Sequence, residues 1–346
     1  MVDSKQQWKA WLYLLPAILL LLVFTVWPII NTVRIAFLEG YSPLGAINGT
    51  QYPFGFGNFA KVITYPKFLT CLKNTMLLTV ITVPISCFLA LLVSVFLNSI
   101  PKFSKFFQTV YFLPYVTNAI AIGMVFAMMF NIIGLRTVPV ADAGQFEVYN
   151  VYLKEVTETL ADGTTVTTMV EMGQIADSWG IINNLIIFFG GQPISWINQY
   201  SGYGANIAVM VIYIVWNALP MKILILLGGL QSVNKQYYDA AKIDGTSKVR
   251  TFFRITVPLL SPMIAYTVIT SFIGGFKEYS SIVGVYGDKM GPASDPGRLN
   301  TMVGFIYDAL SGDHYGRASA AALILFGIIL LVTLINLYVS SKKVHY

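Results

Sequence analysis

The stretch YYDAAKIDGTSKVRTFFRITVP, residues 237–258, is a charged interruption in a chain that is otherwise dominated by long apolar runs. Apolar segments long enough to cross a bilayer flank it on both sides. Its composition places it in water, because charged side chains are costly inside a bilayer. The sequence therefore predicts a short polar unit between two membrane spans.

The local pattern of this unit predicts two short helices joined by a turn. Residues 237–243 have a helix-forming composition, and Asp244-Gly245 supplies the turn. Thr246 or Ser247 can then cap a second helix that reaches towards Arg254. An ordinary basic loop would not require this arrangement.

Composition excludes a soluble globular protein, because 56% of the 346 residues are hydrophobic and only 11% are charged. Six apolar segments meet the roughly 20-residue requirement for crossing the hydrocarbon core. Each must be a helix, since backbone groups in lipid have to bond internally. The predicted spans are residues 11–34, 74–97, 106–130, 206–229, 262–285 and 318–340. The predicted fold is an all-α polytopic membrane protein with a single transmembrane domain over residues 1–346, in which Pro28, Pro84, Pro114 and Pro220 kink or end helices.

The distribution of basic residues predicts the orientation. With the N-terminus in the cytoplasm, eleven Lys and Arg residues and three acidic residues fall inside, against nine basic and thirteen acidic residues outside. The positive-inside rule then places both termini and residues 235–258 on the cytoplasmic side of a cell membrane. Lys222 is interpreted as an anchor at the cytoplasmic end of its helix. The net charge is +6, but the basic residues lie in short loops between apolar runs, which is the pattern of membrane topology. No nucleic-acid partner is therefore expected.

The connection between the third and fourth spans is long and is predicted to lie outside. Residues 147–172 alternate apolar and polar side chains around Ala161-Asp162-Gly163-Thr164, which predicts a β-hairpin with a two-residue turn. That register sets Lys154 opposite Glu171 and Val156 opposite Met169. We expect residues 132–179 to form an extracytoplasmic insertion, either decorative or in contact with an external partner. Residues 181–189 and 194–200 are expected to be short helices at the outer interface.

No enzyme site is predicted. The chain lacks a glycine-rich loop followed by Lys-Ser or Lys-Thr, so it has no phosphate cradle of the ATPase kind. His314 and His345 have no metal-ligand partners at suitable spacing, and Cys71 and Cys87 fall at the start of and within one span. We therefore expect no metal, no cofactor and no disulfide framework.

Polar and aromatic residues at membrane depth indicate a pathway for a solute. Hydroxyl, amide and aromatic groups suit hydrogen bonding to, and stacking on, a neutral polyhydroxylated molecule. Ordinary helix packing is the competing explanation for any one of them. The candidate pathway residues are Tyr115, Asn118, Tyr213, Trp216, Asn217, Tyr266, Thr270, Lys277 and Glu278.

Two runs in the polar unit, Asp239-Ala240-Ala241-x-x-Asp244-Gly245 and Phe252-Phe253-x-Ile255-x-Val257-Pro258, resemble the EAA signature of permease subunits of bacterial ABC importers. Further runs resemble the carbohydrate-uptake branch, of the maltose and multiple-sugar type: Leu14-Leu15-Pro16-Ala17, Asn58-Phe59, Asn74-Thr75, Gly180-Ile181-Ile182-Asn183, Gly228-Gly229-Leu230-Gln231 and Tyr315-Gly316-x-Ala318. The resemblance covers nearly the whole chain except about residues 132–179. It departs from the family at Asp239, where Glu is usual, at Thr246, where Ala is usual, and at residues 287–292.

The resemblance implies a six-helix permease core with cytoplasmic coupling helices, and it assigns ATPase coupling to Asp239, Ala240, Ala241, Asp244, Gly245 and Pro258. It also implies three kinds of protein partner: a second homologous permease, two cytoplasmic ATPase subunits and an extracytoplasmic solute-binding protein. ATP and Mg²⁺ would bind to the ATPase subunits, so the chain itself is expected to be no enzyme. The implied activity is import of a sugar or oligosaccharide delivered by the binding protein.

Other functions stay open at this point. The chain could be an ABC permease for a non-sugar solute, or a secondary transporter, although no internal repeat with proton or sodium sites is visible. It could also be a receptor that uses the predicted hairpin as a ligand module.

Overall fold

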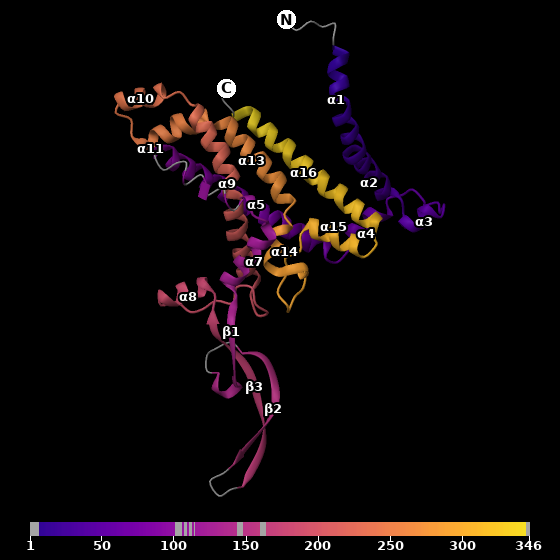
Figure 1. Cartoon of the computed structure of the whole chain (residues 1–346), viewed down its shortest axis with the longest axis vertical. Coiled ribbons are helices and arrows are strands. Elements are labelled where there is room, and N and C mark those ends of the chain that lie inside the picture. Colours follow the sequence, from indigo (N-terminus) through magenta and orange to yellow (C-terminus); the bar gives the residue numbers. More distant parts are fainter. Residues whose placement is uncertain are drawn as a thin grey trace. The chain divides into compact units, whose positions relative to one another are not determined.

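The computed structural model describes residues 7–100, 106, 109, 110, 113, 115–143, 148–159 and 164–343. The chain is mostly helical (Figure 1). It divides into two compact units. Unit 1 comprises Met1–Val83, Asn234–Tyr279 and Asn300–Tyr346, and unit 2 comprises Pro84–Val233 and Ser280–Leu299. Each unit is described by itself below.

Unit 1 is helical throughout its described elements. In chain order these are α1 (Gln7–Leu21), the π-helical η2 (Leu22–Val26), α2 (Trp27–Phe37), α3 (Pro43–Ile47), α4 (Gly57–Ile63), the first half of α5 (Phe68–Ser99), α10 (Gln236–Ile243), α11 (Lys248–Thr251), the π-helical η4 (Phe252–Thr256), α12 (Val257–Leu259), α13 (Ser261–Phe276), α15 (Met302–Ser311) and α16 (Tyr315–Lys343).

The core of unit 1 forms where α16 meets α2, α4, α13 and α15. Ala320 and Ala321 of α16 are fully buried there, and Ala36 of α2 is buried in the same cluster. Small side chains let helix backbones approach closely, which is how helices associate in lipid without a hydrophobic driving force. Phe276 and Phe305 fill the remaining space.

Two π-helical turns precede prolines in unit 1. Trp27 donates its backbone N–H to the carbonyl of Leu22, five residues back, just before Pro28. Val257 donates to Phe252 in the same way, just before Pro258. Proline has no N–H to donate and its ring crowds the preceding turn, so the helix widens where the ladder is interrupted. The helix with Pro28 continues to Phe37, whereas the helix with Pro258 ends at Leu259.

Four helices are long and apolar enough to cross a bilayer among the residues that the structure describes: Trp11–Phe37, Phe68–Ser99, Tyr203–Ser232 and Tyr315–Lys342. A fifth candidate is the pair Lys248–Leu259 and Ser261–Phe276, which is bent by 70°. Many of their apolar side chains are exposed, Leu20 and Phe24 included, although half of the apolar window of Tyr203–Ser232 is buried. The chain is therefore a multi-pass membrane protein, because a soluble protein does not expose contiguous apolar surface of this extent.

Two predicted spans are not continuous helices. Residues 262–285 divide into α13 and α14 (Ser280–Tyr286), because Lys277 caps α13 and the helix does not resume until Ser280. In residues 106–130, α7 (Ala119–Phe130) starts only after Asn118, whose side chain accepts a hydrogen bond from the N–H of Ile120 at 2.8 Å. The described residues before it, from Phe106 to Val116, are helical, and Pro114 lies outside them.

Unit 2 combines helices with a small sheet. Its elements are the second half of α5, α7, β1 (Ile132–Pro139), the 3₁₀ turn η3 (Val140–Asp142), β2 (Tyr149–Thr159), β3 (Thr165–Trp179), α8 (Ile181–Phe188), α9 (Tyr203–Ser232), α14 and the 3₁₀ turn η5 (Gly287–Lys289). α7 packs against α14 and α9. A Cβ on Gly123 of α7 would lie 2.6 Å from the Cα of Gly284 of α14, so these two helices cross with backbone against backbone.

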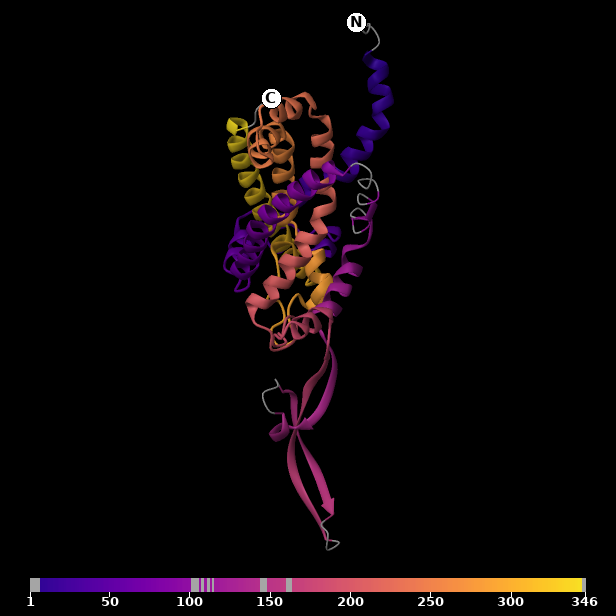
Figure 2. The same cartoon turned by 90° about the vertical axis from the view of Figure 1, so that its left-hand side faces the viewer.

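The insertion is a three-stranded antiparallel sheet in the order β1-β3-β2. Figure 2 shows its long paired strands as arrows. β1 pairs with the second half of β3, and the first half of β3 pairs with β2 alone. A two-stranded ribbon is marginal by itself, so the part that carries β1 supports the rest. Residues Ala161-Asp162-Gly163, predicted to form the turn, lie outside the described residues.

The predicted register of β2 and β3 is wrong by one residue. Lys154 pairs with Val170 and Val156 pairs with Thr168, and the last pair is Thr159 with Thr165. Five residues, 160–164, therefore connect the two strands, so the connection is longer than the predicted two-residue turn. The predicted helix at residues 194–200 is also wrong: this segment is an irregular loop, whereas residues 181–188 form α8 as expected.

Candidate functional site

The polar unit of residues 236–258 has the predicted helix-turn-helix form. α10 ends in a Schellman motif, in which Gly245 N–H bonds to the Lys242 carbonyl at 3.1 Å and Thr246 N–H bonds to the Ala241 carbonyl at 2.9 Å. Gly245 has φ +66°, a conformation that a residue with a Cβ adopts only at a cost. Of the two candidate caps it is Ser247 that caps α11, by accepting from the N–H of Arg250.

Most of the predicted coupling residues lie at the surface of this unit. Ala240, Asp244 and Gly245 are exposed, Ala241 is buried, and Pro258 of α12 is half-buried. Asp239 makes an ion pair with Lys242 one turn on, at 3.0 Å, with both side chains mostly exposed. Such a pair stabilises little, because solvent screens it. The carboxylate of Asp239 is therefore available to an external group.

Apolar side chains are also exposed on this polar unit. Ile243 is 87% exposed, Val249 is 68% exposed and Phe253 is 63% exposed. Single exposed apolar residues are ordinary, but three within eleven residues of a short charged segment mark a contact surface. Tyr238 and Thr256 join the two arms of the unit through a weak hydroxyl–hydroxyl bond of 3.4 Å.

Two of the candidate pathway residues of unit 2, Tyr213 and Trp216, pack against the ring of Phe126. The Tyr213 hydroxyl donates to the carbonyl of Ala119, next to Asn118. The Phe126 ring lies 4.8 Å from the Tyr213 ring and 5.2 Å from the ring of Trp216. Tyr213 is fully buried, whereas Trp216, Asn118 and Tyr115 are exposed. Asn217 is half-buried on α9, so these residues present both packed and open faces.

The candidate pathway residues of unit 1 lie along α13 and at its end. Thr270 donates its hydroxyl to the carbonyl of Tyr266 at 2.8 Å, and both side chains are exposed. Lys277 is exposed at the helix cap, and the Glu278 carbonyl accepts from the hydroxyl of Thr301. The nine predicted pathway residues thus belong to two separate groups, one in each unit.

Lys222 is not the exposed anchor that the sequence predicts. Its side chain is only 8% exposed, and its Nζ donates to Ser86 Oγ of α5. A buried ammonium group needs such a partner, because desolvation is costly. The hydropathy pattern gives no sign of this contact, since α5 and α9 are distant in sequence.

Several residues that carry the family resemblance hold loops in place. Asn183 accepts from Ile194 N–H at 3.1 Å and from Trp196 Nε1 at 3.0 Å, which closes the loop of residues 189–201. Asn74 donates to the Asn300 carbonyl at 2.9 Å, and Thr75 accepts from Met302 N–H at 2.9 Å. These amides and hydroxyls satisfy buried backbone groups that irregular segments leave open.

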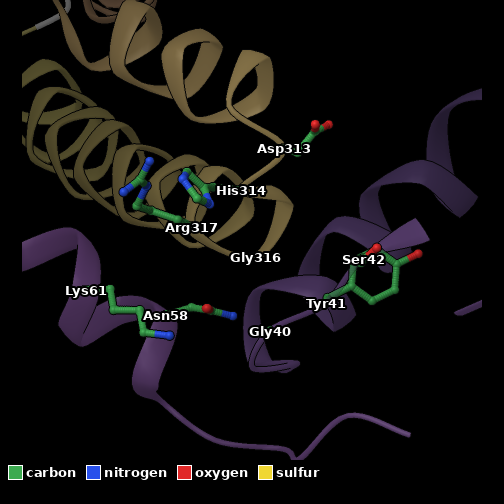
Figure 3. Close-up of a pocket in the computed structure, with 9 residues that line it drawn as sticks. All are labelled: Gly40, Tyr41, Ser42, Asn58, Lys61, Asp313, His314, Gly316 and Arg317. Carbon is green, nitrogen blue, oxygen red and sulfur yellow. The ribbon is translucent and has the colours of Figure 1, made fainter. Parts of the chain in front are cut away.

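A polar pocket of about 330 Å³ lies in unit 1 beside the start of α16 (Figure 3). Lys61, His314 and Arg317 line it together with Asp313 and Asn58. A Cβ on Gly316 would lie 2.5 Å from Asn58 Nδ2, and Asn58 in turn donates to the carbonyls of Ala36 and Leu38. Sequence reasoning missed this pocket, although Asn58 and Gly316 both belong to runs that carry the resemblance.

No group of three or more His, Cys, Asp or Glu residues that could hold a metal ion occurs in the described part of the chain. The arrangement offers surfaces for contact, polar side chains on membrane helices and small residues at turns and crossings. These features suit conformational change and passage of a solute.

Comparisons with known proteins agree with this description. A family model described as "Binding-protein-dependent transport system inner membrane component" matches residues 83–345. The arabinooligosaccharides transport system permease protein AraP of Bacillus subtilis (strain 168) is 27% identical over 336 residues, which cover 96% of this chain and 88% of that protein. The lactose transport system permease protein LacF of Rhizobium radiobacter is 27% identical, over 95% of this chain and 91% of its own.

The same likeness extends to solved structures. The crystal structure of a bacterial alginate ABC transporter in complex with alginate pentasaccharide-bound periplasmic protein contains a similar chain. The TM-score is 0.69 and the sequence identity is 18%, over 99% of this chain and 98% of that one. At this identity the likeness shows a shared fold.

Proposed function

Because the chain belongs to the family of binding-protein-dependent transport system inner membrane components, we propose that it is the permease subunit of an ATP-driven sugar importer. The similarity to permeases named for arabinooligosaccharides and lactose supports a sugar or oligosaccharide as the solute. The observation that carries the proposal is the polar unit of residues 236–258. It is a charged helix-turn-helix with exposed apolar and acidic side chains, between two apolar segments of the chain.

The proposed architecture has six spans, with both termini and the polar unit in the cytoplasm. The four long helices supply four spans, and the broken segments around α7 and around α13 with α14 supply the other two. Broken helices in a membrane are tolerated where they line a water-filled cavity or are buried in protein. The insertion of residues 132–179 then lies outside the cell membrane.

The proposed coupling joins this chain to ATPase subunits through α10 and α11. Ala240 and Gly245 let a partner's backbone approach, and Asp239, Asp244 and the exposed apolar residues supply contacts. ATP and Mg²⁺ act on the two ATPase subunits, and this chain has no catalytic role. Energy enters because ATP-bound and ATP-free partners bind different conformations of the permease with different affinity. Ala241 and Pro258 then transmit the movement to α13.

The proposed pathway uses Tyr115, Asn118, Tyr213, Trp216 and Asn217 from unit 2, and Tyr266, Thr270, Lys277 and Glu278 from unit 1. A second homologous permease completes the pathway, and a binding protein delivers the solute. The match to a transporter solved with its periplasmic protein supports that last partner. Aromatic rings with hydroxyl and amide groups nearby suit a neutral saccharide.

The first test is co-purification and reconstituted uptake. We expect the detergent-solubilised chain to retain an ATPase subunit. We also expect vesicles that contain the complex to accumulate lactose or arabinotriose only with ATP and the binding protein. Trp216→Ala and Lys277→Ala should lower both uptake and solute-stimulated ATP hydrolysis, and unchanged rates in both variants would remove these residues from the pathway. Uptake that needs no ATPase subunit and follows an ion gradient would instead make the chain a secondary transporter.

The second arm tests the coupling residues. Ala240→Asp and Gly245→Asp should abolish uptake and leave membrane insertion intact, because both positions are exposed and the change blocks docking. Ala46→Asp is the matched control, since Ala46 is an exposed alanine in the short helix α3. Ala241 is a poorer choice, because its side chain is buried and a carboxylate there would also destabilise α10. Normal uptake by either coupling variant would refute the assignment.

A further inference from the structure

A second pocket lies in unit 2, at the root of the sheet, where the strands leave the ends of the membrane helices. Its volume is about 370 Å³, within the usual range for small-molecule sites. The lining comes from the end of α7, the first residues of β1 and β2, the loop before α9 and the loop after η5. Asn131, Tyr149, Asn150, Asn198 and Gln199 supply its polar groups, and none of the lining residues is charged.

The backbone at one wall of this pocket is strained. Asn150 has φ +49°, and the pairing of β2 with β3 slips between Tyr149 and Tyr152. A bulge of this kind redirects side chains, and strained non-glycine residues cluster at ligand sites. The Asn150 amide donates to Gln174 Oε1 at 2.8 Å, which fixes it at the wall.

The opposite wall is a pinned turn. The Asn198 carbonyl accepts from both the N–H and the hydroxyl of Ser201, and the Gln199 carbonyl accepts from the hydroxyl of Ser294. The side-chain nitrogen of Asn198, in contrast, is buried and has no hydrogen-bond partner among the described residues. An unpaired buried donor is unusual and costly. Rotation of the amide exchanges its nitrogen and oxygen, so it can turn its donor towards an acceptor in the pocket.

We propose that this pocket is an accessory binding site for a neutral saccharide, separate from the pathway through the spans. Amides offer a donor and an acceptor side by side, which matches a sugar hydroxyl. The ring of Tyr149, which packs 5.1 Å from the ring of Tyr200, adds an aromatic group to the lining. A charged ligand would find no counter-charge in the lining. The proposal rests on the proposed function only in the choice of solute class.

The location gives the site a role in delivery. Tyr213 lies about 15 Å along α9 from Tyr203, at 1.5 Å per residue, and Trp216 lies about 20 Å along it. A saccharide held before the start of α9 is therefore separated along the helix from the pathway residues Tyr213 and Trp216. The insertion, which the family resemblance leaves unexplained, supplies Tyr149 and Asn150 to this site.

The test is saturation-transfer NMR on the full chain in lipid nanodiscs, with lactose and arabinotriose as probes and glucuronate as the charged comparison. We expect transfer to a neutral probe and none to glucuronate. Asn198→Ala should weaken binding about fivefold or more without lowering the melting temperature, because its buried nitrogen makes no protein hydrogen bond. Asn150→Gly removes the amide and keeps the left-handed backbone, and it should weaken binding similarly.

Trp216→Ala removes the contribution of the pathway, and the part of the transfer that depends on Asn198 should persist in this variant. No transfer to either neutral probe, or transfer that persists in both Asn variants, would overturn the site. Binding lost in Trp216→Ala would assign it to the pathway instead. If the probes bind in this Asn198-dependent way while vesicles accumulate neither sugar, the proposed function fails and the site stands.

Discussion

The crossing of α7 and α14 and the turn between α10 and α11 both depend on glycine, but for opposite reasons. At the crossing, a Cβ on Gly284 would lie 2.9 Å from the Cα of Gly123 and 3.0 Å from the Ile120 carbonyl oxygen. At the turn, a Cβ on Gly245 would meet nothing within 4 Å. The first glycine is required by a neighbour in the same chain, and the second by the sign of its own φ angle.

This difference separates a contact made within the chain from a surface that is open to another protein. Two backbones in contact leave no room for a third body, so the crossing contributes to folding. The turn has open space around a small residue and exposed apolar side chains beside it, so its packing is available to another protein. Mutations at the crossing should therefore lower stability, and mutations at the turn should change partner binding.

The largest effect is expected at the crossing. Gly284→Ala should destabilise the solubilised chain by about 2 kcal/mol, because a methyl group would have to displace backbone atoms. Thermal unfolding in detergent measures this. Gly228→Ala is the matched control, because Gly228 is helical with nothing within 4 Å of a Cβ, and it should be neutral or stabilising by up to about 1 kcal/mol. Equal melting temperatures for the two variants would mean that the close approach of α7 and α14 is not the reason for glycine at position 284.

A smaller and local effect is expected at the turn. Gly245→Ala should cost about 1 kcal/mol through the positive φ, and Gly245→Asn should cost less, because asparagine tolerates that conformation. Amide exchange of residues 236–256 measures it, with protection about fivefold lower for the Ala variant. Identical exchange in the Ala and Asn variants would mean that φ is not the reason for glycine.

The smallest effect on stability is expected for the ion pair of α10. Asp239→Asn and Lys242→Gln both break it, and each should change stability by no more than about 0.5 kcal/mol, because the pair is exposed. Retention of the ATPase subunit separates the two variants: Asp239→Asn should reduce it and Lys242→Gln should reduce it less. Equal retention of the subunit by both variants would assign Asp239 a role confined to its own helix.

Prediction from sequence worked where a signal is local. The helices of the polar unit, the turn at Gly245 and the four long spans follow from composition, capping residues and run length. The register of β2 and β3 could not be predicted from the sequence. Asp162-Gly163 suits a two-residue turn, but five residues connect the two strands. The break at Lys277 was also not predicted, because an apolar run does not show where a helix ends within it.

The candidate sites divide in the same way. The predicted coupling residues all lie within residues 239–258, so their pattern is visible in the sequence. The amide pocket is assembled from Asn131, Asn150 and Asn198, which are far apart along the chain, and each is an ordinary polar residue by itself. Lys222 and Ser86 likewise meet only after α5 and α9 have folded.

The sequence by itself determined that this chain spans a membrane several times, carries a polar helix-turn-helix unit and belongs to an importer family. These properties depend on run length, charge placement and short contiguous motifs. Tertiary structure alone decided which glycines hold helices together, which amides close loops and which line a pocket. The physical reason is that burial and hydrogen bonding are settled by groups distant in the chain, whose approach no local pattern specifies.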